Sequence, residues 1–235
     1  MRRILLSASL VSLMLAPLVA GRSAPPSFEG LWSYATIGNP KTGHPAVKIA
    51  GLFLFKQGRF VQQSLNEGEP WDQQLAQAHT GTYQFSGGMI HMTAAVGIVV
   101  DPPSAQPVQS RRDSQHEVTP ERSGDRLTLT FGTGTVQTFT RVGPGKGDVL
   151  LLDRGALALV DGHFLLVAEA RNGGTAAAGS GAFTRTGRGV TLTPDRWLTM
   201  RDGRHRYDRG HAIDVPLGGP TVALPDGMGF PVMRQ

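Results

Sequence analysis

The chain has 235 residues, of which 40% are hydrophobic, a level typical of a globular protein rather than a disordered one. Its 31 glycines and 16 prolines favour many short strands joined by tight turns over helices. It has no cysteine, which excludes disulfides, thiolate metal sites and a cysteine nucleophile, and its net charge of +5 is scattered rather than gathered in the basic stripe that nucleic acids require.

Residues 1–20 have the pattern of a secretory signal peptide: a basic MRR, an apolar run interrupted by Pro17, and the small residue Ala20 before a cleavage site. The apolar run is shorter than the ~20 residues of a membrane-spanning helix. We therefore predict cleavage, a periplasmic or secreted protein, and no transmembrane segment in the mature chain. Loss of Arg2 and Arg3 would leave a net charge of +3.

The following segments alternate short apolar runs with turn sequences. The runs GLWSYATI, VKIAGLFLF, RFVQQSL, GTYQF, MIHMT, RLTLTF and TVQTFTRV are separated by glycine-rich or proline-containing turns such as KQG and SGG. Consecutive hairpins predict an antiparallel meander, and a meander of about eight strands hides its edges by closing into an up-and-down β-barrel. We predict an all-β fold of this kind.

One segment has helical spacing. In residues 69–78, EPWDQQLAQA, the apolar residues Trp71, Leu75 and Ala78 lie at i, i+4 and i+7, and Pro70 suits a first helical turn. We predict a short helix that either forms a lid over one end of the barrel or only caps the core.

The chain repeats its hairpins in the same order. Residues 51–61 resemble 155–165, and residues 81–93 resemble 181–193, so that Gly81 corresponds to Gly181. We infer a duplication with a linker at 143–148, which gives domains 28–142 and 148–235. The alternatives are two tandem barrels, one barrel plus a repeat-derived β domain, or one wider barrel built from both halves.

The first half contains three motifs that together resemble a known family. They are Gly30-Leu31-Trp32, GTYQFSGGMIHMT at 81–93, and GDRLTLTFGTGTVQTFTRV at 124–142. With them, residues 28–142 resemble the bacterial lipocalin-like domains of the calycin group, whereas the second half has no tryptophan at its beginning and has Thr191 in place of His91. The resemblance implies a barrel closed at one end by Trp32 beneath Arg141, and it also marks His91 as a family position.

The candidate ligand-binding residues lie in the first barrel. Aromatic rings and methionine suit an apolar pocket as well as a packed core. His91 alternates with Ile90 and Met92, so it faces solvent if these two face inward, and otherwise it is a polar group inside the barrel. The candidates for ligand binding are Phe53, Phe55, Tyr83, Phe85, His91 and Met92.

No catalytic residue, metal site or cofactor is predicted. His205 and His211, six residues apart on an extended strand, would stand roughly 20 Å apart, too far to share a metal. The sequence therefore predicts an exported, lipocalin-like protein whose partner is a small hydrophobic or amphipathic ligand and not nucleic acid. The alternatives are a structural envelope protein with filled barrels, or an isomerase or cyclase in which His91 and a carboxylate such as Glu67, Glu69 or Asp72 share one cavity.

Overall fold

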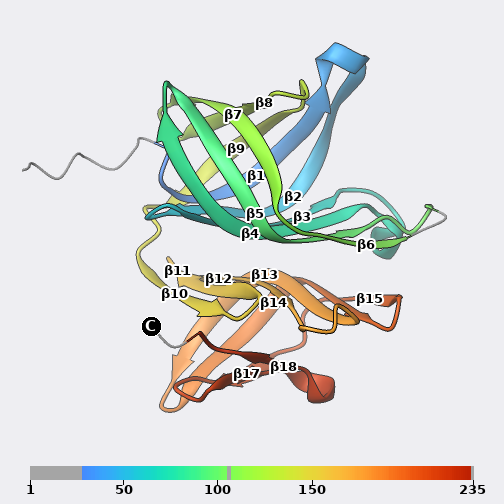
Figure 1. Cartoon of the computed structure of the whole chain (residues 1–235), viewed down its shortest axis with the longest axis vertical. Helices are drawn as coiled ribbons and strands as arrows, with labels where there is room; N and C mark the ends of the chain where they lie inside the picture. The colour runs from blue at the N-terminus through green and yellow to red at the C-terminus, as the bar shows by residue number, and fades with distance from the viewer. Residues whose placement is uncertain (1–27, 105–106, 234–235) are drawn as a thin grey trace, which may run out of the picture.

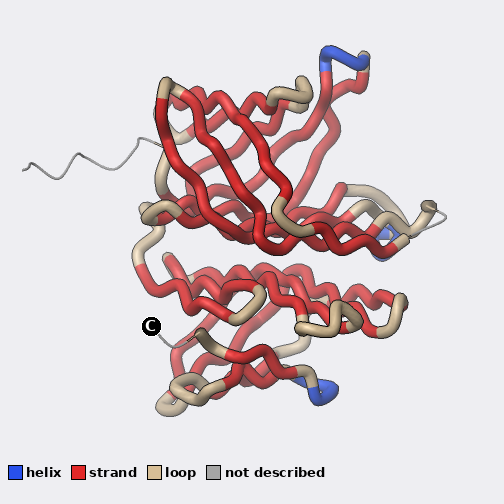
Figure 2. Tube along the Cα trace, in the orientation of Figure 1, coloured by secondary structure: helices blue, strands red, loops and turns tan. Residues whose placement is uncertain are grey.

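The computed structural model describes residues 28–104 and 107–233. Most of this part of the chain lies in β-strands, and its helical segments are the 3₁₀ turns η1 Pro40–Thr42, η2 Trp71–Gln73 and η3 Pro225–Gly227 (Figure 2). The all-β class is therefore confirmed. The proposed signal peptide, residues 1–20, lies outside the described residues. No helix in the described part of the chain is long and apolar enough to cross a membrane.

The first half, residues 28–143, forms a closed antiparallel barrel of eight strands, as the hairpin pattern predicts (Figure 1). The pairing order is β1-β2-β3-β4-β5-β7-β8-β9, and β9 pairs with β1 to close the ring. β6 pairs with the C-terminal end of β5 alone. The strands are β1 Gly30–Asn39, β2 His44–Lys56, β3 Arg59–Asn66, β4 Ala76–Ser86, β5 Met89–Val100, β6 Val108–Arg111, β7 Ser114–Ser123, β8 Arg126–Phe131 and β9 Val136–Gly143.

The second half, residues 147–233, does not close into a barrel. Within the described residues its main sheet is open, with the order β10-β11-β12-β13-β14-β15 and with β16 also paired to β14, while β17 and β18 form a separate two-stranded sheet. This corrects the expectation of two tandem barrels and of one wider barrel. The strands are β10 Gly147–Leu152, β11 Gly155–Val160, β12 His163–Glu169, β13 Thr175–Thr186, β14 Gly189–Arg201, β15 Arg204–Asp208, β16 Ile213–Pro216, β17 Thr221–Ala223 and β18 Gly229–Pro231.

The second sheet packs against the outside of the barrel wall. Strands β3, β4 and β5 face β11 to β14 across an apolar layer (Figure 1). Leu52 and Leu54 point into this layer, while Phe53 and Phe55 on the same strand point into the barrel. Strand β2 therefore reads as a continuous apolar run because both of its faces are buried, one in each core.

A β-bulge lets β5 serve both cores. Thr80 pairs with Val96 and Gly81 with Ala94, so Ala95 is an extra residue without a cross-strand partner. Before it, Ile90, Met92 and Ala94 point into the barrel; after it, Val96, Ile98 and Val100 point to the second sheet. Side chains alternate along a strand, so one added residue exchanges the two faces.

The second half carries a bulge at the corresponding place. Ser180 pairs with Arg196 and Gly181 with Pro194, which leaves Asp195 as the extra residue. A Cβ atom at Gly81 would overlap the carbonyl oxygen of Thr93, and one at Gly181 would overlap that of Thr193. Glycine is therefore required at both positions by the close approach of the paired strand.

Residues 69–78 do not form the predicted helix. Only Trp71–Gln73 make a single 3₁₀ turn, and β4 begins at Ala76. Trp71 packs edge-to-face on Tyr207 of the second half, with ring centroids 5.7 Å apart, and the guanidinium of Arg209 lies 4.8 Å from its ring. The segment therefore joins the two halves and is not a helical lid over the barrel.

Candidate functional site

One end of the barrel is closed by a tryptophan and two arginines. The guanidinium of Arg141, the residue paired with Trp32 on the neighbouring strand, lies 5.5 Å from the centre of the indole ring. Arg122 lies at 5.6 Å from the same ring. The indole nitrogen donates a hydrogen bond of 2.8 Å to the carbonyl oxygen of Phe28, which fixes the segment before β1 across this end.

Aromatic rings fill the interior above this closed end. Phe53 and Phe55 stack with centroids 4.4 Å apart, and Phe28 packs edge-to-face on Phe55 and Tyr83. The Tyr83 hydroxyl donates a hydrogen bond to Glu29. Burial, followed by the bond to the Glu29 carboxylate, raises the pKa of this phenol, so it stays protonated. Aromatic side chains therefore occupy this half of the barrel.

The opposite end, called the open end here, contains a cavity of about 260 Å³. Apolar and aromatic side chains form much of its lining, and polar side chains from several strands complete it. The lining residues are Tyr34, Ile37, Phe53, Phe60, Gln62, Gln77, His79, Met92, Ala94, Val99, Arg111, Ser114, His116, Phe131, Thr133, Thr135 and Gln137.

A chain of hydrogen bonds crosses the cavity wall from β1 to β4. The Tyr34 hydroxyl donates to Oε1 of Gln62 over 2.9 Å, and Nε2 of Gln62 contacts Nδ1 of His79. Because the amide nitrogen is a donor, Nδ1 of His79 accepts, and the proton of the neutral ring sits on Nε2. No described residue accepts a hydrogen bond from that Nε2–H, which leaves a donor available at the cavity.

Burial keeps His79 neutral. Burial, with smaller contributions from the nearby His116 and Arg111, lowers the pKa of His79 to about 4. Gly97 provides the space for the ring, because a Cβ atom there would lie 2.7 Å from Cδ2 of the imidazole. Burial also raises the pKa of Tyr34, so the first donor of the chain remains protonated. The hydrogen-bonded chain is therefore uncharged at neutral pH.

Polar groups at the open end are not fully paired. Oε1 of Gln137 is buried and accepts no hydrogen bond from any described residue. Arg111, on the last position of β6, donates to the neutral Gln109 side chain at 3.2 Å, and no ion pair involving it occurs in residues 28–104 and 107–233. Burial and then Arg111 lower the pKa of His116. A ligand can therefore find donors and an acceptor already in place.

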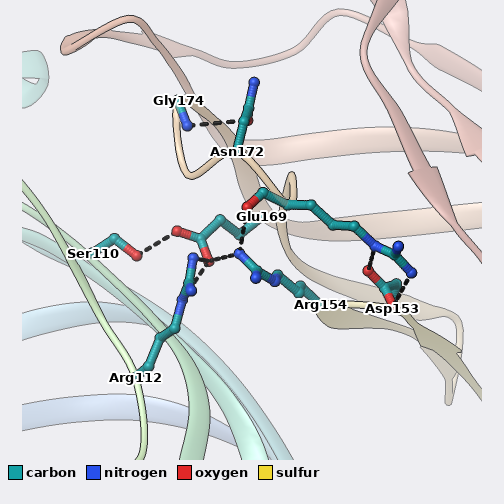
Figure 3. Close-up of polar contacts among 8 residues, drawn as sticks. Ser110, Arg112, Asp153, Arg154, Glu169, Asn172 and Gly174 are labelled. Atoms are coloured by element: carbon teal, nitrogen blue, oxygen red, sulfur yellow. Dashed lines mark hydrogen bonds and ion pairs between the residues drawn. The ribbon is translucent and has the colours of Figure 1, made fainter.

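The second half holds the strand that carries Arg111. The Glu169 carboxylate on β12 is only 1% exposed and accepts a 2.6 Å hydrogen bond from Ser110 (Figure 3). Arg112 binds the same carboxylate through two nitrogens at 3.0 and 3.2 Å, and Arg154 approaches it at 3.9 Å. The residues on both sides of Arg111 are thus fixed to Glu169.

The six sequence candidates separate into three groups. Phe53 and Met92 line the cavity. Phe55 and Tyr83 belong to the packed half of the barrel. Phe85 is 46% exposed, and His91 lies on the outer face of β5, where its Nδ1 is 3.7 Å from the Glu117 carboxylate. His91 does not line the cavity because the inward set on β5 is Ile90, Met92 and Ala94, and Phe85 packs on Phe28, in the packed half of the barrel.

Sequence reasoning did not find the polar lining. The glutamines beside Phe60, Val61 and Leu65 in RFVQQSL were a usable signal for Gln62, since a polar residue in a strand buried on both faces needs a hydrogen-bond partner. The partners of His79 lie on strands far away in sequence, so no local pattern marks it. Arg111 and Arg112 are adjacent and of the same type, so the sequence does not show that they serve different sites.

No protein-family model, curated protein or solved structure matches this chain. The barrel is compatible with a calycin-like fold, and membership of the lipocalin-like family stays a prediction. No cluster of three or more His, Asp or Glu side chains suited to a metal ion occurs in the described ranges.

Proposed function

We propose that this protein binds a small amphipathic molecule in the cavity of its barrel. The observation that carries the proposal is the uneven filling of the barrel. One half is packed with aromatic rings, whereas the other encloses about 260 Å³ beside a prearranged hydrogen-bond chain. Stability alone does not explain a neutral buried histidine with an unused hydrogen-bond donor, because an unpaired buried polar group destabilises the folded state.

The cavity volume limits the size of the ligand. A cavity of about 150 Å³ holds a benzene molecule, so one of about 260 Å³ accommodates roughly ten non-hydrogen atoms. Phe53, Phe60 and Met92 offer contacts to an apolar portion. Polar groups of the ligand can accept from Nε2 of His79 or donate to Oε1 of Gln137. The matching ligand is therefore short and has one polar end.

We also propose that the protein is exported and that its two halves arose by duplication. Export is supported by the signal-like pattern of residues 1–20. Duplication is supported by the bulges at Ala95 and Asp195, one hundred positions apart, and by a shared pairing scheme. In that scheme the C-terminal end of β5 pairs with β6 and its N-terminal end with β7. The C-terminal end of β14 likewise pairs with β15 and its N-terminal end with β16. The second copy would act as the support for the first.

A methyl-labelling experiment tests the binding function. Met92 is the only methionine among the cavity-lining residues, whereas Met200 and Met228 lie in other apolar clusters. With ¹³C-methyl methionine, titration with 1-octanol should shift the Met92 signal in a saturable manner and leave the Met200 and Met228 signals unchanged.

Two alanine variants provide the matched control. Ala94 lines the cavity and is 1% exposed, so Ala94→Leu should fill part of it and weaken octanol binding. The neighbouring Ala95 is exposed at the bulge, so Ala95→Leu should bind as the wild type does. Equal movement of all methionine signals, or no saturable shift with any amphiphile of this size, would refute a binding cavity.

A further inference from the structure

The ionisable lining side chains of the cavity that can carry charge near neutral pH are all basic. Its lining contains Arg111, His79 and His116, and no aspartate or glutamate is among the lining residues of the described chain. Arg111 is close enough to lower the pKa of both histidines, which places its positive charge within reach of the cavity interior. Arg111, an exposed side chain, therefore places a positive charge at the cavity, and no carboxylate among the lining residues balances it.

Arg111 differs from the arginine that follows it. Arg112 forms a two-nitrogen contact with the buried Glu169, and Arg154 also approaches that carboxylate. Ser110, on the other side of Arg111, donates to Glu169 as well. Successive side chains of a strand point to opposite faces, so the anchoring of Ser110 to the second half directs Arg111 to the cavity side.

The surroundings of Arg111 strengthen its attraction for an anion. Apolar groups, among them Val99 and Phe131, form part of the same wall, and ionic hydrogen bonds are stronger beside such surfaces than in open water. Ser114 and His116, two residues apart on β7, add two hydrogen-bond donors to the cavity lining. Arginine can bind both oxygens of a carboxylate at once through its planar fork of N–H groups.

We infer that the polar end of the ligand is a carboxylate, bound by Arg111 at the open end with further hydrogen bonds from Ser114 and His116. Its apolar chain then extends along Met92 toward Phe53. This inference rests on the proposed function, since it names the chemical class of the molecule in the same cavity. The primary amide of Gln137 adapts to either kind of polar group, because it carries both an acceptor and donors.

Three probes of equal chain length test the inference on the full mature chain. Octanoate, 1-octanol and octylammonium differ in head-group charge and have about ten non-hydrogen atoms each, the size that the cavity allows. Dissociation constants come from calorimetry and from the Met92 methyl shift near neutral pH. Octanoate should bind about ten-fold more tightly than octanol, and octylammonium should bind most weakly.

Variants of two arginines complete the test. Arg111→Gln should weaken octanoate binding about ten-fold and octanol binding much less, and Arg111→Lys should restore part of the preference. Arg126→Gln removes the same charge from the first residue of β8, close in the sheet to Thr140 and remote from the cavity lining, and should have no effect on either probe. Circular dichroism and unfolding midpoints confirm that each variant is folded.

The outcomes separate the inference from the proposed function. If octanol binds as tightly as octanoate, or if Arg111→Gln weakens both equally, the carboxylate assignment is wrong while the binding cavity stands. A preference for octylammonium would also overturn the assignment. If none of the three probes binds, the proposed function fails, and the inference fails with it.

Discussion

Ser110 in the first half donates a 2.6 Å hydrogen bond to the buried carboxylate of Glu169 in the second half. The next residue along the chain, Arg111, lines the barrel cavity. The second half therefore fixes the position of a strand that borders the candidate ligand site. The open sheet of the second half, which is not part of the barrel, thereby contributes to the geometry of the site.

Breaking the contact between Arg112 and Glu169 should destabilise the protein. Arg112→Met leaves a carboxylate that is 1% exposed with Ser110 and the more distant Arg154 as its remaining partners. We expect a loss of about 2 kcal/mol in the free energy of unfolding, less than for a fully buried pair because Arg112 is partly exposed. Urea unfolding measures this loss.

Two further variants control this prediction. Arg171→Met breaks an ion pair with Asp153 on the surface and should leave the unfolding midpoint nearly unchanged. The double change Arg112→Met with Glu169→Leu removes both charges and should recover part of the loss. A single Arg112→Met variant as stable as the wild type would show that the contact contributes nothing to joining the halves.

The neutral state of His79 should make stability depend on pH. Its pKa is about 4 in the folded chain, against an ordinary value of 6.5, so between these values the unfolded chain binds a proton that the folded chain does not. Stability should consequently fall as the pH decreases through this window, by about 2 kcal/mol between about pH 7.5 and about pH 5. Below the folded pKa this group adds no further loss.

A substitution isolates the contribution of His79. His116 and Arg111 also face this part of the cavity, and the pKa of His116 is lowered too, so the wild-type curve contains more than one group. His79→Gln should flatten the dependence of unfolding free energy on pH by the amount given above. If the wild type and the variant lose stability in parallel, His79 is not buried in its neutral form.

Replacing Gly97 by alanine should destabilise the protein. A Cβ atom there would lie 2.7 Å from Cδ2 of His79 and would displace the imidazole from Gln62. Gly97→Ala should cost about 1–3 kcal/mol of stability, because buried polar groups lose partners, and should weaken octanol binding. Gly187→Ala is the matched control, since nothing lies within 4 Å of a Cβ atom at that turn. Equal stability of the two variants would contradict the prediction.

The closed end should contribute to stability and not to binding. Arg141→Met removes one of the two guanidinium groups over Trp32, with Arg122 remaining, so we expect a loss of about 1 kcal/mol in the free energy of unfolding. The Met92 methyl shift on octanol addition should be the same as in the wild type. A large change in octanol affinity would mean that the packed end and the cavity are coupled.

The barrel was predictable because the sequence patterns that indicate it lie within short segments of the chain. Turns such as KQG and SGG separate runs with strand periodicity, and closing an antiparallel meander leaves few alternatives. The helix predicted for residues 69–78 was wrong because Trp71, Leu75 and Ala78 have helical spacing by sequence alone. The structure instead uses the alternation of Ala76 and Ala78 toward the second sheet with Gln77 and His79 toward the cavity.

The open second sheet and the polar lining were not predictable from local patterns. Strands such as β12 are buried on both faces, with Leu165 in one apolar cluster and Leu166 in another, so their apolar runs do not show where a sheet ends. The contact between Gln62 and His79 and that between Ser110 and Glu169 depend on which strands become neighbours. Pairing of this kind follows from the complete topology rather than from any single segment.

The bulge at Ala95 gives one small residue control over what is inside and what is outside. If Ala95 instead paired in register as an ordinary strand residue, simple alternation along β5 would turn Val96, Ile98 and Val100 toward the barrel, while Gly97 and Val99 would face the second sheet. The cavity would be filled with branched side chains, and the layer between the halves would lose them. A change of one residue in the register of two strands would thus abolish both the cavity and the contact between the halves, although no amino acid of the chain was changed.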